Sequence, residues 1–158
     1  MRRDLLRAFI FSAALLNAAC TPGAATAPSG GGAPISGAFV IHVSLLKFTP
    51  HSSQFGTVAG YDPNPATVPV GSIVQFVNDD NFAHTATSVG ASGFPSGSPL
   101  SSSATAAQGG DLSAAGWSSG NLLGGGFSRG FTASVPGTYY YGCFYHYGTP
   151  MRGVIVVQ

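Results

Sequence analysis

Three side chains near the end of the chain could bind one metal ion. Cys143 offers a thiolate, His146 an imidazole and Met151 a thioether, in the spacing Cys-x2-His-x4-Met. A loop between two strands can bring ligands at this spacing to one point. His84, which follows an expected strand much earlier in the chain, is the candidate for a fourth ligand. The sequence therefore predicts one metal site that joins two distant segments.

This set of donors is typical of one class of metal centre. Two imidazoles and a thiolate in a plane, with a weak axial Met, form the sites of blue-copper electron-transfer proteins. Cu(II) prefers nitrogen and oxygen donors and Cu(I) prefers soft sulfur, so a mixed set serves both oxidation states with little ligand movement. A zinc site made from His84, Cys143 and His146 is the alternative. The Met at the fitting spacing favours copper.

Some of these residues also have ordinary structural interpretations. Cys143 could be a buried thiol, or could form a disulfide with Cys20 in an oxidising compartment. The disulfide is disfavoured, because Cys20 lies at an expected cleavage site and before an expected flexible tether. His42, within an expected strand, and His51, in an expected turn, are interpreted as structural or solvated.

The elements that must position the ligands are expected to be β-strands. Runs of apolar, β-branched and aromatic residues predict strands at residues 38–43, 72–78, 127–135, 138–143 and 153–157. Turn residues separate them, as in Asp62-Pro63-Asn64-Pro65. Residues 90–116 are rich in Ser, Gly and Ala without a sustained period, so we expect a long loop insertion there. The predicted fold class is all-β, a sandwich of about seven to eight strands.

The composition supports this fold class and excludes others. Charged residues make up 7% of the 158 residues, and there is no Glu. This share is well below the roughly 25% that is usual for soluble domains. A coiled coil, a helical bundle and a nucleic-acid-binding module with basic patches are therefore excluded. The 23 Gly and 11 Pro favour strands joined by turns.

The beginning of the chain is expected to be an export signal, residues 1–20. A basic segment precedes a mostly apolar run that is too short to span a bilayer of about 30 Å. Small residues precede Cys20, as at the cleavage site of a bacterial lipoprotein, and a lipidated Cys20 would tether the protein to the membrane. Arg2-Arg3 also looks like part of a twin-arginine signal.

Two further segments follow the expected signal. Residues 21–36 are rich in Gly, Pro and Ala and are predicted to be a flexible linker. Residues 37–158 are predicted to be the folded domain. We expect this domain to lie in the periplasm or to be anchored to the membrane outside the cytoplasm.

Taken in order, the motifs resemble the cupredoxins, and within them the plastocyanin and pseudoazurin branch. The resemblance is carried by Asn81-Phe82-Ala83-His84, Pro136-Gly137-Thr138-Tyr139 and Cys143-x2-His146-x4-Met151. It implies a Greek-key β-sandwich over residues 37–158, with residues 90–116 unmatched. It also implies one type 1 copper ion, bound by His84, Cys143, His146 and Met151.

Two positions depart from the family pattern. Thr85 stands where plastocyanin-like proteins commonly have an Asn that ties the two ligand loops together. A hydroxyl can make a shorter version of that bond. Tyr145 stands where the family often has a Pro. Such neighbours tune a metal site without changing its ligands.

The resemblance implies a protein that shuttles single electrons between redox partners. We expect no enzyme activity, because copper enzymes need further His ligands and only His42 and His51 remain. We expect a monomer with no nucleic-acid partner, and redox proteins that dock at an apolar patch around His146. Residues expected in that patch are Phe82, Tyr145, Tyr147 and Pro150. A copper storage or delivery module and a copper-free binding module are the alternative functions.

Overall fold

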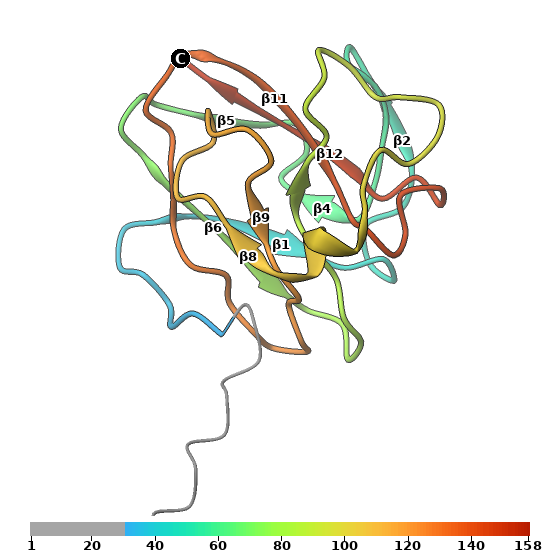
Figure 1. Cartoon of the computed structure of the whole chain (residues 1–158), viewed down its shortest axis with the longest axis horizontal. Helices are drawn as coiled ribbons and strands as arrows, with labels where there is room; N and C mark the ends of the chain where they lie inside the picture. The colour runs from blue at the N-terminus through green and yellow to red at the C-terminus, as the bar shows by residue number, and fades with distance from the viewer. Residues whose placement is uncertain (1–30) are drawn as a thin grey trace, which may run out of the picture.

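The computed structural model describes residues 31–158, so the predicted export signal and most of the predicted linker lie outside the described residues. Within this range the chain forms two β-sheets and a separate hairpin (Figure 1). A short 3-10 helix, η1 (Ser102–Thr105), is the one helical element of residues 31–158. No helix in this range has the length and hydrophobicity to cross a membrane. The all-β fold class is confirmed.

The two sheets contain strands from all parts of the described chain. The first has the order β10 (Phe131–Thr132), β6 (Ile73–Asn78), β1 (Phe39–Val43) and β4 (Tyr61–Asp62). The second has the order β5 (Ala66–Val68), β12 (Arg152–Val157), β11 (Gly137–Gly142), β7 (Thr87–Ser88), β9 (Ser118–Ser119) and β8 (Ala107–Gln108). The hairpin pairs β2 (His51–Ser53) with β3 (Gly56–Val58).

Two of the strand pairs are parallel, β1 with β6 and β12 with β5. Parallel neighbours cannot be joined by a tight turn, so the chain leaves one sheet and visits the other between them. The result is a Greek-key sandwich. In Figure 1, β11 and β12 run side by side in opposite directions, with the start of β11 beside the end of β12 near the C-terminus.

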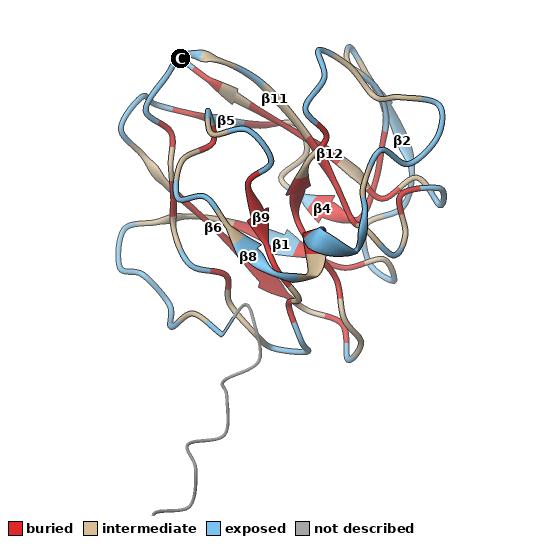
Figure 2. Cartoon of the chain, viewed as in Figure 1, coloured by how far each residue is buried: buried red, intermediate tan, exposed pale blue. Residues whose placement is uncertain are grey.

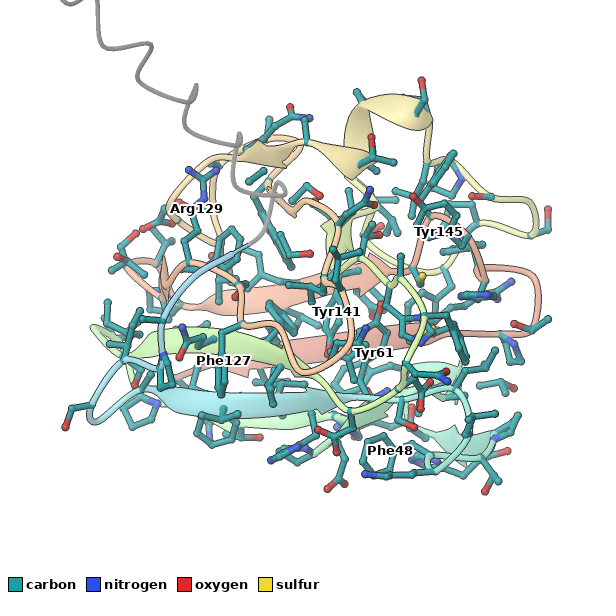
Figure 3. All side chains as sticks on the ribbon, turned by 90° about the horizontal axis from the view of Figure 1, so that it is seen from below. Phe48, Tyr61, Phe127, Arg129, Tyr141 and Tyr145 are labelled. Atoms are coloured by element: carbon teal, nitrogen blue, oxygen red, sulfur yellow. The ribbon has the colours of Figure 1, made fainter. Side chains whose placement is uncertain are left out.

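Alternating side chains hold the two sheets together. In β1, Ile41 and Val43 are fully buried, whereas His42 between them is exposed. Burial of each such aliphatic side chain contributes about 1.5–3 kcal/mol. Tyr61 and Tyr141 fill the space between the sheets, with ring centroids 4.7 Å apart (Figure 3). Figure 2 shows the buried residues concentrated along β6, β9 and β12.

The strands are shorter and more numerous than predicted. Twelve strands occur in residues 31–158, where about seven to eight were expected. The expected strand at residues 127–135 is reduced to β10. Ahead of it, Ser128 binds the backbone of Phe76 through its own N–H and its hydroxyl, which replaces a regular strand pair. The prediction that His51 lies in a turn is wrong, because this residue pairs with Val58 in the hairpin.

The insertion at residues 90–116 is only partly a loop. It contains η1 and β8, and β8 pairs with β9 to extend the second sheet. No sequence period marked β8, because it consists of Ala107 and Gln108 alone. The insertion therefore forms one edge of the sandwich.

Residues 31–36 contact the first sheet. Gly32 N donates to Phe127 O at 2.7 Å, and Ile35 N donates to the side-chain oxygen of Gln75 at 3.0 Å. The Gln75 amide donates in turn to Ala33 O and Ser128 O. Gln75 is fully buried. A buried amide must find hydrogen-bond partners, and this segment supplies them to β6.

Candidate metal centre

Three of the four candidate ligands lie in the loop between β11 and β12. Cys143 follows the last residue of β11, and Met151 precedes the first residue of β12. Cys143 N donates to Met151 O at 3.1 Å, and Met151 N donates to His146 O at 3.1 Å. The paired strands thus hold both ends of the loop. The backbone bonds bring the cysteine and the methionine next to each other.

The fourth candidate, His84, lies in the segment that follows β6. It forms a two-way backbone pair with Leu122, with N···O distances of 3.1 and 2.8 Å. Asn78, the last residue of β6, shapes the turn before it by donating to Phe82 O and Leu122 O. His84 is fully buried. Its position is therefore set by both the β6 end and the chain that leads away from β9.

Ligand atoms of these two segments meet at one point. Atoms of His84, Cys143 and His146 all lie within 4.8 Å of one another. The Cys143 sulfur is 3.7 Å from His84 Nδ1 and 3.5 Å from His146 Nδ1. An ion with bonds of about 2.0–2.3 Å to three surrounding donors spaces those donors at about this distance. The residues present therefore fit a metal ion bound by one sulfur and two nitrogens.

Met151 is buried against the loop that precedes β4. Its side chain is fully buried, and it packs on Gly60. A Cβ on Gly60 would lie 2.4 Å from Cγ of Met151, and Gly60 has a φ of +76°. A glycine is required there for both reasons. Gly60 therefore leaves the space that the thioether occupies.

A carboxylate lies behind His84. Asp80 Oδ2 accepts a hydrogen bond from His84 Nε2 at 2.9 Å, and both side chains are almost completely shielded from solvent. Asp80 also accepts from Ser44 Oγ at 2.5 Å and Leu45 N at 2.7 Å. Burial raises the pKa of Asp80, but these hydrogen bonds together lower it below its ordinary value. Asp80 is thus a buried, ionised partner of the imidazole.

The protonation of the candidate ligands follows from burial. Burial lowers the pKa of His84, although the hydrogen bond with Asp80 opposes this, and burial also lowers the pKa of His146. Both rings are therefore neutral at neutral pH, the form that binds a metal. Burial raises the pKa of the Cys143 thiol, against the hydrogen bond from Thr85 N. A bound cation would favour the thiolate instead.

The surroundings of His146 differ from those of His84. This ring is only partly buried and has Phe82 at 5.8 Å and Tyr145 at 6.1 Å between centroids. Tyr145 is 45% exposed and lies at the end of the sandwich opposite Arg129 (Figure 3). Tyr147, in contrast, is buried, and its ring packs under the Arg152 guanidinium at 4.3 Å. Aromatic side chains therefore surround the partly exposed ring of His146.

Comparison with known proteins identifies the family. Residues 49–158 match the copper-binding proteins of the plastocyanin/azurin family. The chain belongs to this family. The expected resemblance to cupredoxins is confirmed, and copper is the cofactor that this membership and the donor set support. Membership also supports a role as a blue copper electron carrier in general.

Two solved amicyanin structures share the fold. The reduced form of an amicyanin variant has a TM-score of 0.51 and 21% identity, over 79% of this chain and 86% of that chain. The reduced Cu(I) form of another amicyanin variant at pH 4 has a TM-score of 0.51 and 22% identity over the same shares. A purple cupredoxin from Nitrosopumilus maritimus has a TM-score of 0.45 and 22% identity, over 75% of this chain and 98% of that chain. No curated protein matches.

Contacts of this cupredoxin account for its two departures from the family pattern. Thr85 Oγ1 accepts a hydrogen bond from Phe144 N at 2.9 Å, so the hydroxyl does tie the two ligand loops together. Thr85 N points at the Cys143 sulfur at 3.4 Å. Tyr145, in the place of Pro, donates from its hydroxyl to Asn121 Oδ1 at 2.8 Å. This bond connects the ligand loop to the segment after β9.

Sequence reasoning missed Asp80 as a part of the site of this cupredoxin. The available signal was an acidic residue four positions before His84, in the turn that carries the ligand. Asp79 lies next to it and carries the same side chain, yet faces the surface, where it binds His42 and Lys47. The sequence alone did not distinguish these two neighbours.

Proposed function

We propose that this cupredoxin carries single electrons between redox partners, with one type 1 copper ion bound by His84, Cys143, His146 and Met151. The observation that carries the proposal is the approach of both Nδ1 atoms to one buried cysteine sulfur, at 3.7 and 3.5 Å. A bound copper ion would supply the change between Cu(II) and Cu(I). The mixed nitrogen and sulfur donors suit both states.

The protein supplies a site that holds its shape during this change. Thr85 binds both the sulfur of Cys143 and the backbone N–H of Phe144, so the two ligand segments move together. Met151 is held by backbone bonds and by the close contact with Gly60. Ligands that need not move permit fast electron transfer. The resident groups thereby favour a carrier over a module that releases its metal.

The surface around His146 supports docking of a redox partner. The patch consists of the partly exposed ring of His146 with Phe82, Tyr145 and Pro150. Tyr147, which was expected to contribute, is buried and stays beneath the surface. None of these four residues is an Asp, Glu, Lys or Arg. We therefore expect a small apolar interface that buries less than about 1,200 Å² of surface in total. An electron would pass through the imidazole of His146.

The remaining parts of the proposal rest on the sequence. We propose export to the periplasm or anchoring outside the cytoplasm, through the signal-like residues 1–20 and Cys20. We also propose that the chain acts as a monomer and catalyses no reaction. His42 and His51, the other two histidines, contact Asp79 and backbone carbonyls at the surface.

A visible absorption spectrum tests the proposed function. We expect an intense thiolate-to-copper band when Cu(II) is added to the purified protein, bleaching with ascorbate and return on oxidation. Cys143→Ser should abolish the band, whereas His51→Ala, a change of an exposed histidine, should leave it intact. A band that survives in Cys143→Ser would contradict the proposal. Loss of copper to a modest chelator on reduction would favour the storage or delivery function.

A further inference from the structure

Asp80, the buried carboxylate behind His84, lies outside the group of converging candidate ligands. The side chain of Asp80 retains 2% of its exposure, and that of His84 retains none. Its Oδ2 accepts from His84 Nε2 at 2.9 Å and Leu45 N at 2.7 Å, and its Oδ1 accepts from Ser44 Oγ at 2.5 Å. A buried charge is costly unless it is paired and hydrogen-bonded. Three donors around one carboxylate meet that condition.

The hydrogen bond decides which nitrogen of His84 faces the sulfur. In a neutral imidazole one nitrogen carries the proton and the other carries a free lone pair. An acceptor-only carboxylate at Nε2 places the proton there, which leaves the lone pair on Nδ1. Nδ1 is the atom that lies 3.7 Å from the Cys143 sulfur. The ring is therefore prepared to bind a metal before any metal arrives.

We propose that Asp80 is a positioning residue that orients His84 and lowers the reduction potential of the copper site. This inference rests on the proposed function. The site gains one positive charge when Cu(I) becomes Cu(II), and a fixed anion nearby favours the more positive state. Surface charges are strongly screened by water and salt. Asp80 is shielded from solvent, so its charge acts on the site with less screening. Asp80 thus sets the balance between the two oxidation states from behind the ligand.

Asp79 provides a matched control in the next position. Its carboxylate binds His42 Nδ1 at 3.1 Å and Lys47 Nζ at 3.1 Å, and its side chain keeps 20% of its exposure. Asp79→Asn and Asp80→Asn each remove one negative charge from adjacent residues. Only Asp80 contacts a candidate ligand. The pair therefore separates the local effect on His84 from a general effect of net charge.

The test compares the reduction potentials of copper-loaded wild type, Asp80→Asn and Asp79→Asn. An Asn carbonyl can still accept from His84 and Leu45, and its amide can donate to the Ser44 hydroxyl, so the site should still form. We expect Asp80→Asn to lower the ratio of Cu(II) to Cu(I) affinity about tenfold, a rise of about 59 mV in potential. Asp79→Asn should change this ratio less than about twofold, because its charge is partly exposed to solvent and paired with Lys47. Equal shifts in the two variants would overturn the proposal.

A second measurement does not depend on copper. Nitrogen NMR of the metal-free wild-type protein reports which nitrogen of His84 carries the proton. We expect the proton on Nε2, and a proton on Nδ1 would overturn the positioning role even if Asp80→Asn fails to fold. If the wild type shows no blue band, the proposed function fails, and this NMR result still decides whether Asp80 orients the ring.

Discussion

The two histidines of the proposed copper site are bound into the protein in different ways. His84 is fully buried, and its outer nitrogen donates to the Asp80 carboxylate. His146 is partly exposed, and within residues 31–158 its Nε2 has no hydrogen-bond partner. The rings of Phe82 and Tyr145 surround it instead. His84 therefore fixes the buried, inner side of the site, whereas His146 forms the exposed, outer side, the proposed outlet through which an electron would leave.

The difference teaches how one small site can be both rigid and accessible. The inner side supplies Thr85, whose backbone and hydroxyl reach Cys143 and Phe144, and an ionised partner for the imidazole. The outer side supplies apolar surface and a ring edge. Electron transfer needs both features, because an electron must leave through a ligand while the ligands stay in place. Variants that affect one side only can test this division.

Removal of each histidine should have the largest effect. His84→Gly and His146→Gly should both lose the blue band. Added imidazole should restore it readily in His146→Gly, because that position opens to solvent, and poorly in His84→Gly. His84→Gly should also cost about 1–3 kcal/mol in the metal-free protein, since it leaves the buried Asp80 carboxylate without its partner.

Absorption during imidazole titration and urea unfolding of the metal-free variants measure these two effects. The expected stability loss for His146→Gly is smaller, below about 1 kcal/mol, because the ring is partly exposed. If the same imidazole concentration restores the blue band equally in both variants, the proposed difference in access to the two histidine positions is wrong.

A matched pair of threonine variants should have an intermediate effect. Thr85→Val removes a fully buried hydroxyl that accepts a hydrogen bond from Phe144 N, and it should cost about 1–3 kcal/mol. Thr149→Val removes an exposed hydroxyl in the loop between β11 and β12, which donates to His146 O at 2.8 Å. We expect that change to stay within about 0.5 kcal/mol. Urea unfolding of the copper-free variants measures both changes in the free energy of unfolding. Similar stability losses for the two variants would contradict the distinction between a buried, rigid side and an exposed side of the site.

The sequence marked the proposed ligands and Thr85, the chain neighbour of His84, but it did not mark the carboxylate behind His84. Cys143, His146 and Met151 lie in one loop, so their spacing alone brought them together, and Thr85 was noticed because it follows His84. Asp80 depends on partners that lie 35 and 36 positions earlier, Leu45 and Ser44, and no local pattern reports such packing.

The same physical limit applies to the strands. The all-β sandwich followed from composition and from runs such as residues 72–78, which become β6. The strand expected at residues 127–135 is largely absent, because Ser128 uses its hydroxyl to bind the backbone of Phe76. Strand pairing stops where a side chain, rather than a backbone group, binds the backbone of the neighbouring strand. Such a contact can be identified only once the neighbouring strand is in place. Local sequence patterns therefore predict well which segments are extended, and they predict less well where strand pairing ends.

Truncation of the exposed aromatic side chain next to His146 should have the smallest effect on the protein and a selective one on its function. Tyr145 is 45% exposed, and its hydroxyl makes one exposed hydrogen bond, to Asn121. Tyr145→Ala should change the free energy of unfolding by about 0.5 kcal/mol or less and keep the blue band. It should slow electron exchange between two copies of the protein by about two- to fivefold. The truncation removes apolar contact area that would hold the His146 rings of the two copies close together.

Val135→Ala is the control for this variant. Val135 is 48% exposed and precedes β11, whereas Cys143 follows the opposite end of that strand. NMR line broadening in mixtures of oxidised and reduced protein measures the exchange rate. Val135→Ala should leave the rate unchanged, since its side chain lies away from the ring of His146. If Tyr145→Ala leaves the rate unchanged as well, the electron does not depend on the aromatic surface around His146, and the outer side loses its assigned role as outlet.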